Sequence, residues 1–159
     1  MRSEAVQWTL EELLPHRPPM VLIDEVESFD AEARRLTAKV KISAEQVFFF
    51  RGERGVPNWV AIEYMAQASA ALVGCWDRHQ GVPVQPGLLL GTRKLELRLE
   101  RFAEGEVYHV TAAEAFNGGD AAAFECSITD DKGVEVATAN LNAYRPPDME
   151  QFMKERGWK

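Results

Sequence analysis

The sequence predicts an α+β fold in which a curved antiparallel sheet wraps one long central helix. Residues 58–78 are apolar nearly all round at helical spacing, which is typical of a buried helix. From Pro86 onward apolar and polar residues alternate with period two, which is typical of half-buried strands. A chain of 159 residues has the length of one ordinary domain, so we expect a single domain over residues 1–159.

The composition is typical of a soluble globular protein, with 46% hydrophobic and 27% charged residues. A formal net charge of -7 argues against binding to nucleic acid or to an anionic membrane, because both partners favour a basic surface. The sequence contains no long apolar span and does not start like a signal peptide. We therefore expect a cytoplasmic protein with no membrane contact.

The first elements are a short helix and two strands. The segment Thr9-Leu10-Glu11-Glu12 fits a capping box, and Pro15 ends the helix that it starts. Residues 20–26 form an apolar run that predicts a strand. Residues 35–42 alternate in hydrophobicity and predict another strand.

The long helix is expected to begin after Asn58, which is a favourable N-cap residue, and to end near Trp76 or Arg78. Gly81 and Pro83 follow and prevent its continuation. Residues 66–71 carry almost no bulky side chain. This stretch allows close approach by a sheet or by a second subunit.

The chain after Pro86 predicts an antiparallel meander. Alternation covers residues 94–100, and further strands are expected over residues 107–116, 121–129 and 134–144. Turn-forming residues connect the last three as hairpins: Asn117-Gly118-Gly119-Asp120 and Asp130-Asp131-Lys132-Gly133.

Neither a metal nor a redox cofactor is expected. Cys75 lies in the helical pattern and Cys126 in a strand pattern, without His or Cys at ligand spacing. Both thiols are predicted to be reduced core residues. The sequence also lacks a Gly-rich dinucleotide loop.

Glu63 is the candidate catalytic residue, because an ionisable group in an apolar helix is costly unless it is paired, protonated or used. Gln67 lies one turn further on the same face. The helix start, at Asn58, Trp59 and Val60, offers amides that can polarise a thioester carbonyl, which places Glu63 as general acid or base. The candidate substrate-binding residues are Asn58, Trp59, Val60 and Gln67. A structural hydrogen bond of Glu63 to a strand or across a dimer is an equal alternative.

Two segments resemble the signature segments of the (3R)-hydroxyacyl-acyl-carrier-protein dehydratases. They are LPHRPPMVLIDEV at residues 14–26 and VPNWVAIEYMAQ at residues 56–67. The resemblance spans most of residues 9–145 and is greatest to the divergent branch found with aryl-polyene-type pathways. It implies a single hot-dog domain, in which the long helix is the sausage and the sheet the bun.

The resemblance also implies a site shared between two subunits. A His from one subunit takes the proton alpha to the thioester, and an acid on the helix of the other helps the hydroxyl leave. Glu63 matches that acid, but Glu53 stands where the family's Gly-His-Phe-Pro segment has its His. The implied assembly is a homodimer, or a heterodimer in which a hot-dog subunit supplies the missing His.

The three histidines of this chain have other predicted roles. His16 matches a family residue that belongs to a structural corner, and we favour that role. His79 falls at the end of the helix, where a cation suits the helix dipole, and His109 lies on a strand face. Asn58 departs from the family's usual Gly before the helix.

The implied substrate is an acyl thioester on a carrier protein or on coenzyme A. Carrier proteins are acidic, so docking needs a local basic patch on this acidic chain. A solvated strand face is an equally good explanation of some of the candidate cations. The candidates are Arg51, Arg54, Arg93, Lys94, Arg98 and Arg101.

Three functions remain open. The first is a dehydratase subunit that supplies Glu63 to a site completed by a His-bearing hot-dog protein. The second is an acyl thioesterase in which the helix carboxylate activates water. The third is a non-catalytic acyl-binding subunit, and we rank the three in this order.

Overall fold

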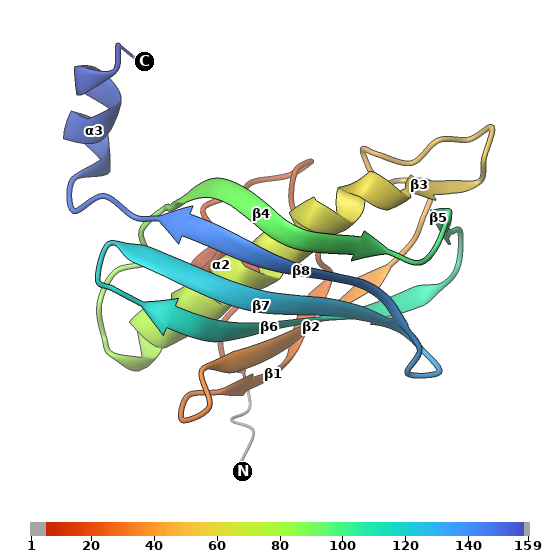
Figure 1. Ribbon diagram of the computed structural model, residues 1–159, viewed down its shortest axis with the longest axis horizontal. Coiled ribbons are helices and arrows are strands. Elements are labelled where there is room, and N and C mark those ends of the chain that lie inside the picture. Colours follow the sequence, from red (N-terminus) through yellow and green to blue (C-terminus); the bar gives the residue numbers. More distant parts are fainter. Residues whose placement is uncertain (1–5, 158–159) are drawn as a thin grey trace.

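The computed structural model describes residues 6–157 and has the predicted α+β layout. A six-stranded antiparallel sheet, with strand order β1-β2-β6-β7-β8-β4, curves around helix α2 (Ala61–His79) (Figure 1). A separate two-stranded ladder joins β3 (Gly55–Pro57) to β5 (Arg101–Ala103). The strands of the main sheet are β1 (Glu25–Asp30), β2 (Arg35–Lys41), β4 (Leu88–Leu97), β6 (Val107–Asn117), β7 (Ala121–Asp130) and β8 (Glu135–Tyr144).

The core lies between the concave face of the sheet and α2. On β2 the alternating residues Leu36, Ala38 and Val40 are fully buried, as the period-two pattern predicts. Small residues of α2 let the helix approach the sheet closely. At Gly74 a Cβ atom would lie 2.3 Å from the carbonyl oxygen of Leu13, so only glycine fits where α1 (Leu10–Leu13) crosses α2.

The predicted start of α1 is confirmed. The Thr9 hydroxyl oxygen accepts a hydrogen bond from the Glu12 amide, and the Glu12 carboxylate accepts one from the Thr9 amide. This reciprocal pair is a capping box, and it satisfies two amides that the helix cannot satisfy itself.

The strand predicted over residues 20–26 is wrong, because β1 begins only at Glu25. Leu22 and Ile23 are buried, which explains the apolar run. The backbone here bonds to a side chain instead of a neighbouring strand: the Leu22 amide donates to Gln67 Oε1 at 2.8 Å. An apolar run predicts burial more reliably than it predicts a ladder of backbone hydrogen bonds.

The predicted N-cap at Asn58 is also wrong. A short 3₁₀ turn, η1 (Asn58–Val60), precedes α2, and no side chain caps either element. The Asn58 side chain instead donates to the carbonyl oxygen of Leu99 at 3.0 Å. Asn58 thus ties the helix start to the segment between β4 and β5.

The meander prediction holds for three strands only. Strands β6, β7 and β8 follow one another in the sheet through the two predicted hairpin turns. Strand β4 pairs with the far side of β8 and forms one edge of the sheet. Leu89 and Leu90 on this edge strand are 45% and 65% exposed, so the edge is apolar where it could accept another strand.

Cys75 and Cys126 are buried core residues, as predicted. Burial raises the pKa of the Cys126 thiol to about 11, although the Ser69 hydroxyl, 3.3 Å from its sulfur, opposes the shift. The Cys126 thiol is therefore protonated at neutral pH, which fits a core residue and not a nucleophile.

The C-terminal helix α3 (Met149–Glu155) stands clear of the sheet (Figure 1). The Asp148 side chain caps it by accepting a hydrogen bond from the Gln151 amide. The Tyr144 and Phe152 rings, with centroids 5.6 Å apart, connect α3 to the end of β8. Over residues 6–157, no helix combines the length and apolarity that crossing a membrane requires.

His109 lies on β6, as predicted, and its ring joins two acidic side chains. Nδ1 lies 2.6 Å from Glu27 Oε1 on β1, and Nε2 lies 3.0 Å from Asp131 Oδ1 in the β7–β8 turn. The hydrogen bond to Asp131, supported by the one to Glu27, raises the pKa of His109 although partial burial opposes the shift. The protonated ring therefore holds three elements together.

These ion pairs predict a pH-dependent contribution to stability. Because the folded-state pKa of His109 is raised, the contribution is complete below the unfolded-state pKa of about 6.5 and is lost as pH rises through the folded-state value. We expect His109→Gln to lower the free energy of unfolding more at about pH 5.5 than at about pH 9. Urea denaturation at both pH values checks this, and an equal loss at both would contradict it.

Candidate functional site

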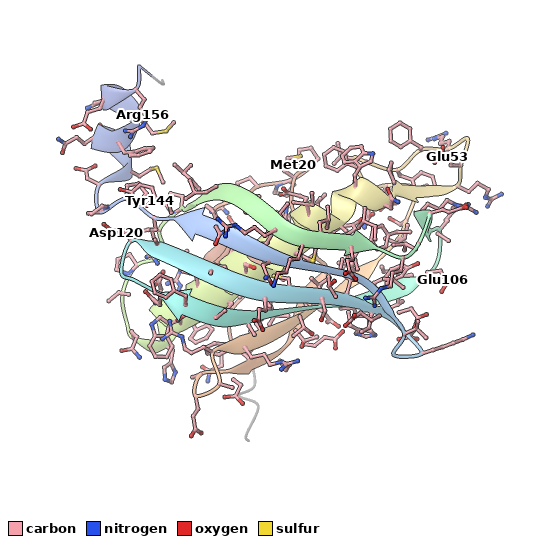
Figure 2. All side chains as sticks on the ribbon, viewed as in Figure 1. Met20, Glu53, Glu106, Asp120, Tyr144 and Arg156 are labelled. Carbon is pink, nitrogen blue, oxygen red and sulfur yellow. The ribbon has the colours of Figure 1, made fainter. Side chains whose placement is uncertain are left out.

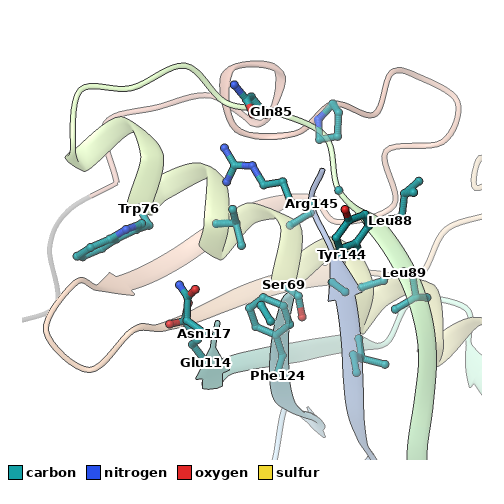
Figure 3. Close-up of a pocket in the computed structure, with 18 of the residues that line it drawn as sticks. Ser69, Trp76, Gln85, Leu88, Leu89, Glu114, Asn117, Phe124, Tyr144 and Arg145 are labelled. Atoms are coloured by element: carbon teal, nitrogen blue, oxygen red, sulfur yellow. The ribbon is translucent and has the colours of Figure 1, made fainter. Parts of the chain in front are cut away.

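A pocket of about 260 Å³ runs along one face of α2, between the helix and the ends of β7, β8 and β4 (Figure 3). Small and apolar side chains form most of its wall, so the pocket suits an extended acyl chain. The lining residues from α2 recur at helical spacing: Glu63, Ala66, Ser69, Ala70, Val73 and Trp76. The strands and the segment before β4 add, among others, Leu88, Ala122, Phe124, Leu141, Ala143 and Tyr144.

Glu63 lies at the N-terminal end of this stripe. Its side chain is 34% exposed and lines the pocket, whereas the apolar sequence around it suggested a buried group. A carboxyl group in a pocket wall can reach both bound substrate and solvent. That position suits proton transfer better than a purely structural contact does.

Gln67 fixes the orientation of Glu63. Its Nε2 donates to Glu63 Oε1 at 2.9 Å and to the Met20 carbonyl oxygen at 2.7 Å, while its Oε1 accepts from the Leu22 amide. Gln67 is fully buried, so this geometry favours a positioning role over the predicted direct contact with substrate. The prediction that Gln67 lies beside Glu63 is correct.

His16 also reaches Glu63, which the sequence did not predict. His16 Nε2 lies 3.8 Å from Glu63 Oε1, and both residues line the pocket. The His16 carbonyl oxygen accepts a hydrogen bond from Arg17 Nη1, which also donates to the Leu14 carbonyl oxygen and so braces a tight corner. Among residues 6–157 the buried His16 Nδ1 has no hydrogen-bond partner. The structural-corner role of His16 remains a prediction. Its Nε2 atom points toward Glu63, the candidate acid.

Glu53, which replaces the family's His, lies in an exposed turn. It sits in the turn between Phe50 and β3 and is exposed at its tip (Figure 2). Glu53 does not line the pocket that contains Glu63. The other two histidines lie elsewhere: His79 ends α2 as predicted, and His109 faces its two carboxylates on the sheet.

The helix start presents one exposed aromatic residue and no side-chain cap. Trp59 is 54% exposed and its ring meets Phe48 edge to face, with centroids 5.9 Å apart. Val60 is buried as a whole residue, and none of Asn58, Trp59 and Val60 lines the pocket that contains Glu63. Pro57, which precedes the first turn, has no amide hydrogen. The predicted positive pole at Asn58, Trp59 and Val60 remains a prediction.

The far end of the pocket is charged, which no pattern in the sequence predicted. Arg34, Trp76 and Glu114 come from the β1–β2 turn, α2 and β6 and all line the pocket. Arg34 Nη2 donates to Glu114 Oε2 at 2.8 Å, and the guanidinium carbon lies 3.5 Å from the centroid of the Trp76 ring. These residues are far apart in the chain, so no local pattern brings them together.

Two of the six candidate cations are already paired. Arg98 bonds to Glu96 and Glu135, and Arg54 bonds to Glu104. The solvated-strand explanation therefore accounts for Arg98. No group of three or more potential metal ligands is present within residues 6–157.

The sequence and the structure are similar to known dehydratases. A family model described as ApeP dehydratase matches residues 8–154. The chain is 30% identical over 133 residues to the 3-hydroxyacyl-[acyl-carrier-protein] dehydratase FabZ of Chlamydia trachomatis serovar L2, covering 72% of this chain and 84% of the relative. It is 36% identical to FabZ of Chlamydia pneumoniae over 95 residues, covering 56% and 60% respectively.

Among solved structures, the dehydratase heterocomplex ApeI:P from Xenorhabdus doucetiae superposes with a TM-score of 0.84 at 26% identity. The match covers 93% of this chain and 97% of that one. A hypothetical thioesterase protein from Streptococcus pneumoniae TIGR4, solved with coenzyme A, matches at a TM-score of 0.59 and 13% identity. The match covers 76% of this chain and 83% of that one, and it shows a shared fold only. The predicted hot-dog fold and the resemblance to aryl-polyene-type dehydratases are confirmed.

Proposed function

Because this chain belongs to the ApeP-like dehydratase family, with a function like that of the 3-hydroxyacyl-acyl-carrier-protein dehydratases, we propose that it is one half of a two-chain catalytic site. In this proposal Glu63 is the acid and a second hot-dog subunit supplies the base. The observation that carries it is Glu63 in the wall of an acyl-sized pocket while the position of the family's His holds an exposed Glu53.

The reaction removes water from a 3-hydroxyacyl thioester. The partner's base takes the proton from the carbon alpha to the thioester, and the electrons of that C–H bond form the new double bond. The bond from the beta carbon to the hydroxyl oxygen breaks, and the hydroxyl leaves as water with a proton from Glu63. The amides of the helix start, near Trp59 and Val60, stabilise the negative charge that develops on the thioester oxygen.

The edge strand β4 is the proposed contact with the second subunit. An edge strand pairs readily with another chain, and the exposed Leu89 and Leu90 add an apolar surface to this edge. The solved relative is named a heterocomplex, which supports a hetero-oligomer for this chain too. The carried substrate is proposed to be an acyl thioester on a carrier protein, with coenzyme A as the alternative carrier.

The test is dehydration of a 3-hydroxyacyl thioester by the purified chain, alone and with hot-dog proteins encoded nearby. We expect activity only in a mixed complex, and loss of activity when the partner's candidate His is replaced. Activity of the chain alone that His16→Gln abolishes would put the base on this chain and contradict the two-chain site. Thioester hydrolysis by the chain alone, lost in Glu63→Gln, would establish the thioesterase alternative instead.

A further inference from the structure

The pocket changes character along its length. At about 1.5 Å per residue, the lining stripe of α2 from Glu63 to Trp76 is ~20 Å long. Beyond Glu63 and His16 the lining stripe of α2 is small and apolar, but at the other end Arg34, Glu114 and Asn117 face the same cavity. A saturated alkyl chain gains nothing from a charged end wall, because burying charges against hydrocarbon is unfavourable.

Arg34 is held in a defined position at that end. Its backbone has a φ of 53° in the turn after β1, and its carbonyl oxygen accepts the Glu114 amide at 2.9 Å. The guanidinium stacks on Trp76 and bonds to the Glu114 carboxylate. The Arg34 and Glu114 side chains are only 23% and 12% exposed, so little solvent weakens their interaction.

One buried nitrogen of Arg34 has no acceptor among the described residues. That nitrogen is Nε. A buried unsatisfied donor costs free energy, and an acceptor delivered by a ligand would remove that cost. The acceptor would have to arrive through the pocket, which Arg34 lines.

We propose that Arg34, Trp76 and Glu114 form a subsite for the distal end of the acyl chain, and that this subsite selects chains ending in a hydrogen-bond acceptor such as a hydroxyl or carbonyl oxygen. Arg34 is the specificity-determining residue. The inference rests on the proposed function, because it takes the thioester to lie at Glu63. It adds a preference at the opposite end of the substrate.

The test compares two 3-hydroxyacyl thioesters of equal length that end in a hydroxyl or a methyl group. With the assembled dehydratase we expect kcat/KM to favour the hydroxyl-ended substrate by about 10-fold or more, the value of a hydrogen bond to a charged group. Arg34→Met is expected to abolish that preference. A 3-hydroxybutyryl thioester, which is too short to reach Arg34, measures dehydration itself in the wild-type enzyme.

Arg35→Met is the matched control, because Arg35 is the neighbouring residue and is exposed on β2. If Arg34→Met does not fold, Arg34→Lys keeps a cation for Glu114 but lacks the Nε donor, and the preference should fall in the same way. No preference in the wild type, or an equal loss on both long substrates, would overturn the subsite. If the wild-type enzyme does not dehydrate the short 3-hydroxybutyryl thioester, the proposed dehydration is wrong. In that case the affinities of the two long thioesters, measured by calorimetry, test the subsite independently of catalysis.

Discussion

Glu63→Gln is expected to lower kcat for dehydration by about 10²- to 10⁴-fold, the usual contribution of a positioned acid or base. Glutamine has nearly the same shape as glutamate, and its side-chain oxygen can still accept the hydrogen bond from Gln67. It cannot give a proton to the departing hydroxyl. KM should change little, because the substitution leaves the pocket wall intact.

The measurement is steady-state dehydration by the complete two-chain enzyme with wild-type or variant Glu63. Glu53→Gln is the matched control, since Glu53 is exposed and lies outside the pocket, and it should leave kcat unchanged. Full activity of Glu63→Gln would limit Glu63 to a structural role. A large loss in Glu53→Gln would show that the turn before β3 takes part in the site.

Arg145→Met is expected to lower the free energy of unfolding by about 2–3 kcal/mol, less than for a fully buried ion pair because the Arg145 side chain is 27% exposed. Arg145 at the end of β8 donates two hydrogen bonds to the Asp77 carboxylate on α2, at 2.8 and 3.3 Å. Asp77 is only 5% exposed, so the variant leaves an unpaired charge in the core. Methionine keeps most of the side-chain bulk, which limits any loss of packing.

Urea denaturation followed by circular dichroism measures this loss. Arg98→Met is the matched control: Arg98 also bonds to carboxylates, but its side chain is 50% exposed, and exposed pairs contribute about 0–1 kcal/mol. Asp77→Asn combined with Arg145→Met should recover part of the stability, because it removes the stranded charge. Equal losses in Arg145→Met and Arg98→Met would show that the Asp77–Arg145 pair contributes no more to stability than an exposed pair.

Periodicity in the sequence predicted most of the fold because its main elements are long and strongly patterned. The helix that became α2 and the three hairpin-connected strands fall within a few residues of their predicted bounds. The errors lie where a side chain forms a hydrogen bond to a partner that is distant in the sequence. The Gln67 amide replaced a strand partner for residues 20–22, and the Leu99 carbonyl took the Asn58 side chain away from the helix start.

The candidate site was predictable only where it is local in sequence. Glu63 and Gln67 are one helical turn apart, so their contact follows from the spacing alone. His16 lies 47 residues before Glu63, and Arg34 is 80 residues from Glu114, so only the tertiary fold brings these pairs together. A resemblance to a family identifies its signature positions, but Arg34 and Trp76 lie outside both signature segments.

The three hydrogen bonds of Gln67 have a consequence for how assembly and catalysis are connected. One amide group bonds to both the Glu63 carboxylate and the backbone at residues 20 and 22, so the orientation of Glu63 is linked to that segment through Gln67. Met20 is 37% exposed and lies at the molecular surface (Figure 2). In the proposed two-chain site, a partner that contacts Met20 would act on Glu63 through Gln67 alone, so that docking would also align the candidate acid.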